Sequence, residues 1–399
     1  ISPYTNQGIT VQILRIRNRG LLEKMNTGWI SFDRSWKEKP SFYYKTNVDE
    51  KESTSKGSVG VNGNVFNTWD TINMECRDKY YIEEEQEKSN IKISIVEVVK
   101  TGLFGRKTND VVKEEINLIY DYKTGRWSGS DSYMDEDGYG HYLGEEYEVW
   151  FNIYQRDYDN DDIPYFTEVN ILGTDPTQDD SKLDPDNDGV PTSWEWKWNY
   201  DPFVYDDHKN LDPDIDGIQN IEEYEMRKYF ADPYQPDIYV EVDYMKKKNI
   251  FDLDHILHEE SKQMVIERYS QHGINCYIDD GWPDGPANGG GEMLPFMERM
   301  PEETSGQCFR FYRHNFADER KGIFRYAYMA NVMGYITPFE DNQYDIINIG
   351  TGWDQSEAYC SVKLIVPFAK RLRMHGIASG LLHELGHSLG LMPVTYYGN

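Results

Sequence analysis

Apolar and polar residues alternate along much of the first 150 residues. In 11–17, 91–99 and 116–120, apolar side chains recur at every second position over part or all of the run. Such alternation places apolar side chains on one face of a strand. Turn-forming residues separate the runs, as at 62–64 and 123–125. Residues 1–150 are therefore predicted to form an antiparallel β-sandwich domain.

A different pattern begins after residue 236. Residues 237–243 and 274–278 are predicted strands, and the apolar spacing of 253–271 between them predicts a helix. A strand, a helix and a second strand form a β-α-β unit, whose parallel strands require such a crossover. A further strand is expected at 344–350 and a further helix at 376–389. We predict a C-terminal α/β domain over residues 237–399.

Acidic residues concentrate between these two regions. Residues 151–236 contain 22 Asp and Glu against 6 Lys and Arg. A solvated acidic linker would explain the charge alone, but the segment also contains three twelve-residue windows in register, at 157–168, 184–195 and 212–223. Each window has Asp at positions 1, 3 and 5, an apolar residue at 7 and Glu at 12. Position 6 is Gly in the second and third windows and Asp162 in the first.

This spacing has a chemical reason. Ca²⁺ takes about 6–8 oxygen ligands at about 2.3–2.6 Å, and alternate carboxylates in a tight loop converge on one point. Position 7 offers its backbone carbonyl, Glu at position 12 can close the shell with both oxygens, and Gly at position 6 permits the sharp turn. The predicted calcium ligands are Asp157, Asp159, Asp161, Ile163 and Glu168, then Asp184, Asp186, Asp188, Val190 and Glu195, then Asp212, Asp214, Asp216, Ile218 and Glu223.

The surroundings of the windows distinguish them from EF-hands, which have a helix on both sides of the loop. Here Asp-Pro pairs follow at 175–176, 201–202 and 232–233, and room remains only for a short helix after each loop. The segment resembles thrombospondin type-3-like calcium-binding repeats of bacteria and archaea. Folding of such acidic repeats should be linked to metal. Extracellular modules bind Ca²⁺ with Kd on the order of 10⁻⁴–10⁻³ M, which favours an extracellular location.

A second metal motif lies near the end of the sequence. His383 and His387 are four residues apart, so on a helix both imidazoles share one face, as two zinc ligands would. Glu384 lies beside them and can accept a proton from a metal-bound water. Gly390 follows three residues after the second His. The alternative is a surface helix that carries two unrelated histidines.

The motif His-Glu-x-x-His-x-x-Gly resembles that of the zincin metallopeptidases, and the segments 237–245, 272–281 and 322–327 resemble stretches that precede the active helix in secreted prokaryotic members with calcium repeats. The combined resemblance covers about 150–399 and implies a zinc endopeptidase that acts on a protein or peptide substrate. The third metzincin ligand would fall on Pro393, and no Glu follows as in gluzincins. A longer natural chain is expected; a ligand from elsewhere or a degenerate site are the alternatives.

The remaining histidines give weaker signals. His255 and His258 are three apart on the predicted helix 253–271 and could bind metal, although solvated helix residues are the simpler interpretation. The other histidines are isolated in sequence and are assigned no role: His141, His208, His272, His314 and His375.

Composition limits the classes of function. Acidic residues number 70 against 41 basic ones, a net charge of −29, which excludes a nucleic-acid partner because binding phosphate needs clustered Lys and Arg. No apolar run reaches the length of a transmembrane segment.

The sequence starts at Ile1, so we expect either a mature secreted chain that has lost its leader or trimmed ends. The competing function is a calcium-dependent cell-surface structural or adhesive protein, as a homo-oligomer or surface assembly, with an inactive zincin-like domain.

Overall fold

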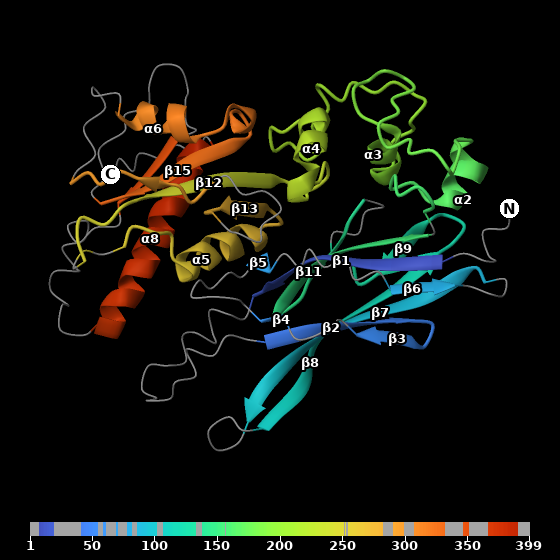
Figure 1. Ribbon diagram of the computed structural model, residues 1–399, viewed down its shortest axis with the longest axis horizontal. Helices are drawn as coiled ribbons and strands as arrows, with labels where there is room; N and C mark the ends of the chain where they lie inside the picture. The colour runs from blue at the N-terminus through green and yellow to red at the C-terminus, as the bar shows by residue number, and fades with distance from the viewer. Residues whose placement is uncertain are drawn as a thin grey trace, which may run out of the picture. The chain divides into compact units, whose positions relative to one another are not determined.

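A computed structural model describes most of the chain (Figure 1). The described residues are 8–19, 41–54, 59–60, 69–70, 78–81, 86–101, 107–132, 138–155, 157–250, 252, 254–281, 290–298, 307–331, 346–350 and 366–389. The chain divides into two compact units, Ile1–Gln235 and Pro236–Asn399. The acidic segment thus belongs to the same unit as the strands that precede it.

Two antiparallel sheets form the β structure of the first unit. In one sheet, β1 (Gly8–Asn18) pairs with the strands β11 (Tyr147–Gln155), β5 (Trp69–Asp70) and β6 (Asp78–Tyr81), and β10 (Gly140–Leu143) pairs with β11. The other sheet has the order β3 (Lys51–Thr54), β2 (Ser41–Val48), β7 (Lys88–Thr101), β8 (Lys107–Asp121) and β9 (Arg126–Gly129), with β4 (Val59–Gly60) also paired to β2.

The alternation in the sequence accounts for how the sheets pack. Ile13 of β1 and Phe151 of β11 belong to the same buried cluster as Ile93 of β7 and Leu118 of β8. Because every second side chain of a strand points to the same face, each sheet presents an apolar inner face and a polar outer face. One hydrophobic core therefore lies between the two sheets.

The acidic segment forms long turns with one short helix after each of its loops. These helices are α2 (Tyr165–Thr167), which continues into the π-helical turn η3 (Glu168–Leu172), then α3 (Thr192–Lys197), then α4 (Asn220–Met226), which continues into the 3-10 turn η4 (Arg227–Tyr229). Val190, Trp194 and Trp198 form a small buried cluster. The ring of Tyr139 lies 5.3 Å from that of Trp198, so aromatic packing ties the repeats to the chain before β10.

The second unit contains a parallel sheet. Its order is β13 (Asn275–Asp279), β12 (Asp237–Met245), β15 (Phe324–Ala330) and β16 (Ile346–Gly350), and β14 (Met293–Leu294) also pairs with β12. The central strands are buried on both faces, as parallel strands covered by helices must be.

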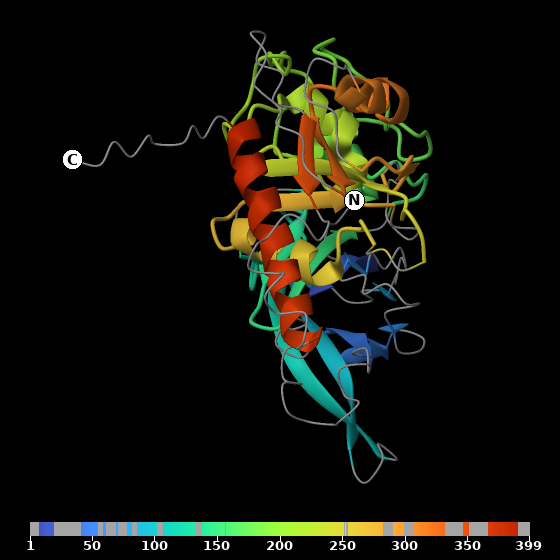
Figure 2. The ribbon, with the colours of Figure 1, turned by 90° about the vertical axis from the view of Figure 1, so that its left-hand side faces the viewer.

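Helices cover both faces of this sheet. The helix α5 (Glu259–Ser270) packs on β13, α8 (Val366–Ser388) packs on β16, and the two helices contact each other, where the Ser261 hydroxyl donates to the Met374 carbonyl at 2.9 Å. Figure 2 shows α8 in front of the sheet with α5 beside it. On the other side, α6 (Gln307–Asn315) contacts β15 through Phe311 and Tyr328, after which comes the 3-10 turn η6 (Asp318–Arg320).

The observed helix bounds correct two expectations. The helix α8 begins at Val366, ten residues before the predicted start. The helix α5 begins at Glu259, so the prediction that His255 and His258 share a helix is wrong. His258 precedes the first turn with extended backbone, and its Nε2 lies 2.8 Å from Asp254, which in turn binds Arg373 of α8. That long-range ion pair fixes the segment before α5 in a non-helical conformation.

Among the described residues, no helix has both the length and the apolar character needed to cross a bilayer.

Candidate metal centres

The three acidic loops share one local hydrogen-bond pattern. In each, the Asp at position 1 accepts backbone N–H groups from later in the same loop: Asp184 accepts from Asn187 at 2.7 Å and from Gly189 at 3.2 Å. The Asp at position 5 accepts the N–H of position 7, as Asp188 does from Val190 at 3.2 Å. The same positions make the corresponding bonds in the other two loops, through Asp157 and Asp161 in the first and through Asp212 and Asp216 in the third. These bonds span five residues or fewer, so the local sequence folds each loop.

The three loops also share the backbone conformation of position 6 and the burial of the side chain at position 7. Position 6 has a positive φ in every loop: +70° at Asp162, +106° at Gly189 and +93° at Gly217. Glycine adopts this conformation without the Cβ penalty, whereas Asp162 adopts it at some cost. The apolar side chains at position 7 are buried and anchor the loops.

The loops bring together the aspartates that the spacing predicted to converge. In each loop, the carboxylates at positions 1, 3 and 5 offer oxygens that all lie within 4.8 Å of one another. The three groups are Asp157, Asp159 and Asp161, then Asp184, Asp186 and Asp188, then Asp212, Asp214 and Asp216. Glu168, Glu195 and Glu223 at position 12 are buried beside them, and Glu195 shares a second group with Asp188 and His208.

Several of these carboxylate oxygens are buried without a hydrogen bond. Among the described residues, the buried oxygens that lack one include both of Asp159, both of Asp186, Oε2 of Glu168, both of Glu195 and Oδ2 of Asp214. A buried acceptor without a donor costs about 1–3 kcal/mol, and more when it is charged. Each loop thus requires either protons or a cation, and carboxylate oxygens alone are the donor set that Ca²⁺ prefers.

The pKa values of several of these carboxyl groups are raised as well. Burial, together with the charges of Asp161 and Asp159, raises the pKa of Glu168 to about 8. Burial likewise raises the pKa of Asp214 to about 8, with Asp216 adding to the effect, and that of Glu195 to about 7 despite the nearby His208. In each case burial and the neighbouring carboxylates disfavour the charged form.

His208 was assigned no role from the sequence, yet the structure places it in the second repeat. Its Nε2 lies 3.1 Å from Asp188 Oδ2 and 3.9 Å from Glu195 Oε1, and all three side chains are fully buried. The equivalent positions of the first and third repeats, twenty residues after the position-5 Asp, are Ser181 and Pro236. No repeated pattern could therefore have identified this histidine.

The predicted zinc ligands lie on α8. The Nε2 atoms of His383 and His387 are 3.0 Å apart, and Glu384 between them is half-buried. Two nitrogens at about 2.0–2.1 Å from one tetrahedral ion would be about 3.3 Å apart, so the pair fits a shared Zn²⁺. Leu381 and Leu385 are fully buried on the opposite side of the helix and hold α8 in place, while His383 is exposed.

A third ligand is not apparent in the part of the chain that the structure describes. None of the groups of three or more metal-binding side chains found there includes His383 or His387. Gly390 and Pro393 of the motif lie outside the described residues.

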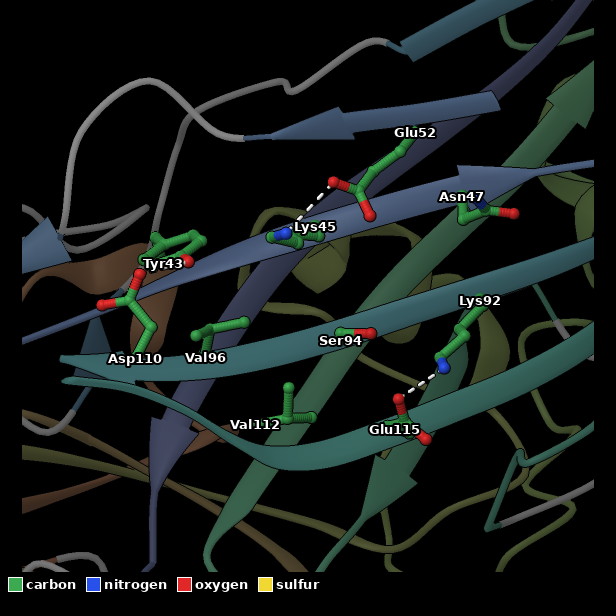
Figure 3. A pocket seen from close by; sticks show the side chains of 10 residues that line it. All are labelled: Tyr43, Lys45, Asn47, Glu52, Lys92, Ser94, Val96, Asp110, Val112 and Glu115. Carbon is green, nitrogen blue, oxygen red and sulfur yellow. Dashed lines mark hydrogen bonds and ion pairs between the residues drawn. The ribbon is translucent and has the colours of Figure 1, made fainter. Parts of the chain in front are cut away.

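A groove on the outer face of the first unit has a different character. Figure 3 shows its lining by side chains of β2, β3, β7 and β8. The Tyr43 hydroxyl donates to Asp110 at 3.0 Å, and Lys45 pairs with Glu52 at 3.1 Å. These paired, partly exposed charges are typical of a solvated sheet surface and indicate no ligand.

Comparisons with known proteins identify no family. No family model and no curated protein matches the sequence. Among solved structures, human GIVD cytosolic phospholipase A2, in complex with an inhibitor and terbium chloride, is 13% identical with a TM-score of 0.23, over 38% of this chain and 17% of that one. Drosophila C2-DSL-EGF1 is 6% identical with a TM-score of 0.21, over 37% of this chain and 67% of that one. Similarities this low define neither fold nor function.

Proposed function

We propose that this protein is a secreted, calcium-stabilised zinc-dependent endopeptidase. The observation that carries the catalytic part is the pair of imidazole Nε2 atoms, 3.0 Å apart on α8, with Glu384 beside them. The parallel sheet beneath α8 supports it, because a rigid layer fixes the helix that presents both ligands. The α/β fold by itself does not imply this activity.

In this proposal, His383 and His387 would hold Zn²⁺. Bound zinc lowers the pKa of a coordinated water to about 7 and polarises a carbonyl. Glu384 accepts a proton from the attacking water on its carboxylate and then delivers it to the leaving amine. The C–N bond breaks. The hydroxyl of the water stays on the carbonyl carbon as part of the new carboxyl group, and the other proton leaves on the amine.

Calcium binding by the three acidic loops is the other part of the proposal. The buried oxygens of Asp159, Asp186 and Asp214 support it, because they lack hydrogen bonds among the described residues and each of these carboxylates repels the other aspartates of its own loop. Ca²⁺ would therefore stabilise the first unit. The millimolar affinities typical of extracellular calcium modules favour secretion or a cell-surface location.

The second candidate is a calcium-dependent structural or adhesive protein of the cell surface. The observation that favours it is that His383 and His387 belong to no group of three ligands among the described residues, whereas catalytic zinc sites normally have three protein ligands. In that case α8 is a packing element, and assembly into homo-oligomers would supply the function.

Metal content and peptide cleavage distinguish the two. The purified chain, Glu384→Gln and His383→Ala are compared for zinc by mass spectrometry and for casein hydrolysis, with His375→Ala as the control for loss of an exposed histidine on the same helix. We expect Glu384→Gln to retain zinc and lose cleavage at least about a hundredfold, His383→Ala to lose zinc, and the control to match wild type. Bound zinc without cleavage by the wild type would favour the structural function instead.

A further inference from the structure

The second repeat differs from the other two because a buried imidazole faces its carboxylates. Asp188 comes from the loop, Glu195 from α3, and His208 from the turn that precedes the third loop. One ligand atom of each lies within 4.8 Å of the others. His208 therefore adds a nitrogen donor to a site in which the sequence pattern predicts only oxygens.

The polar atoms of Glu195 and His208 do not satisfy each other's capacity for hydrogen bonds. Both carboxylate oxygens of Glu195 are buried and have no hydrogen bond within the described part of the chain. At 3.9 Å, the His208 Nε2 is too far from Glu195 to donate a hydrogen bond to it. The fully buried Glu195 carboxylate thus brings an oxygen to within 4.8 Å of the ligand atoms of Asp188 and His208 without receiving a hydrogen bond from the described residues.

We propose that the second repeat binds a first-row transition ion of the Zn²⁺ type through Asp188, Glu195 and His208. Ca²⁺ selects oxygen ligands only, whereas imidazole is a good ligand for zinc, and carboxylates complete many zinc sites. Two ligand atoms at about 2.0–2.2 Å from one tetrahedral ion lie about 3.3–3.6 Å apart. The separations of 3.1 Å and 3.9 Å in the structure lie on either side of this value.

The surroundings of the imidazole fit this role. The Asn220 side-chain amide lies 3.0 Å from His208 Nδ1 and 2.9 Å from the Tyr200 hydroxyl, and Asn220 Oδ1 is buried without a hydrogen bond within the described residues. The two ends of an amide are interchangeable by a half-turn. With Oδ1 toward the ring, Asn220 accepts the proton of Nδ1, and the lone pair of Nε2 is left for the metal. Such a partner on the second nitrogen orients most metal-binding histidines.

This site rests on the proposed cation binding by the repeats and is independent of the peptidase activity. In the second repeat this ion would take the place of the Ca²⁺ proposed above. In the first and third repeats, the predicted ligands are oxygens alone, so those loops remain calcium sites. The chain would then bind two kinds of ion within one acidic segment.

The test uses the chain of 399 residues with His383→Ala and His387→Ala, which removes the histidine pair of α8. Zn²⁺ is titrated by calorimetry in excess Ca²⁺, and His208→Gln is compared with His272→Gln, which removes an exposed histidine. We expect one Zn²⁺ to bind, with an affinity lowered at least about tenfold by His208→Gln and unchanged by the control. Equal affinity in the two variants, or no bound Zn²⁺ in the parent, overturns the proposal.

A second measurement does not depend on folding of the His208 variant. X-ray absorption at the zinc edge of the same parent should show scattering from one imidazole, and a shell of oxygens alone would overturn the proposal. Calcium is counted in parallel, with Asp159→Asn and Asp214→Asn as the variants of the other two loops. If Zn²⁺ binds through imidazole but no Ca²⁺ binds, the calcium proposal fails and this one stands. If Ca²⁺ binds but Zn²⁺ does not, the calcium proposal stands and this one fails.

Discussion

Replacement of Glu168 by Gln should stabilise the protein in the absence of calcium. When calcium is present, the variant should be no more stable than the wild type. Glu168 is fully buried, and its Oε2 has no hydrogen bond among the described residues, while Oε1 accepts only a long bond of 3.3 Å from the Thr174 hydroxyl. Gln has nearly the same shape but no charge. The substitution therefore separates the cost of a buried charge from the packing of the side chain.

The magnitude follows from the pKa of this carboxyl. Burial raises it from 4.5 to about 8 in the folded state. The folded state then holds the proton to higher pH than the unfolded state, so the free energy of unfolding falls as pH rises from about 4.5 to about 8. Each pH unit costs about 1.4 kcal/mol, which sets an upper bound of about 5 kcal/mol. Residual solvent screening reduces the expected gain for Glu168→Gln at pH 8 to about 1–3 kcal/mol.

The assay compares denaturation in chelator and in Ca²⁺, at pH 5 and pH 8. The transition to follow is the one that Ca²⁺ shifts, because the two units need not unfold together. Ca²⁺ at about a hundred times its Kd adds about 2.7 kcal/mol through each loop that binds it. Glu168→Gln loses this contribution from the first loop only, which is enough to cancel its advantage. Glu225→Gln, on the exposed face of α4, serves as the control and should change little under any condition.

The reasoning would be refuted by either of two results. A gain below about 0.5 kcal/mol in chelator at pH 8 would mean that the buried carboxylate carries no such cost. An equal gain in Ca²⁺ and in chelator would mean that Glu168 is not a calcium ligand. At pH 5 the gain should nearly vanish, because the folded carboxyl is protonated and the unfolded one partly so.

Three further predictions concern the same unit. Chelation of Ca²⁺ should lower its melting temperature by at least several degrees, because about 3 kcal/mol is lost from each loop; an unmoved calorimetric transition would contradict calcium binding. Gly189→Ala should cost about 1–2 kcal/mol in urea unfolding, because φ is +106° and the new Cβ would lie 3.3 Å from Ile221. Burial would raise the pKa of Glu148, but Arg17 and His141 hold it at about 2. Arg17→Met should therefore cost about 3–5 kcal/mol at pH 7, a loss that shrinks as pH falls from 4.5 toward 2 and that a pH series of urea unfolding would measure.

The acidic loops show how much a local pattern can determine. The bonds from Asp184 to Asn187 and Gly189 join residues at most five apart, so the twelve-residue spacing was enough to predict that Asp184, Asp186 and Asp188 converge. The placement of His383 and His387 on one helical face is local in the same way. Which ions these groups bind remains a prediction.

Contacts between distant residues could not be predicted. Arg17 and Glu148 are 131 residues apart, and their buried ion pair exists only because β1 and β11 are adjacent. The chain before α5 is held out of the helix by Arg373, more than a hundred residues later. Apolar periodicity indicates which face of an element is buried but not which partner buries it.

The sequence by itself determined the alternating strands, the three carboxylate loops and the paired imidazoles, because each depends on residues within about one or two turns of chain. Only the tertiary structure decided that the turn before the third repeat delivers His208 to Asp188 and Glu195. That encounter depends on how successive loops stack around Trp194, whose ring lies 5.6 Å from that of His208. Stacking is set by side-chain packing across the fold, which no spacing within a single loop records.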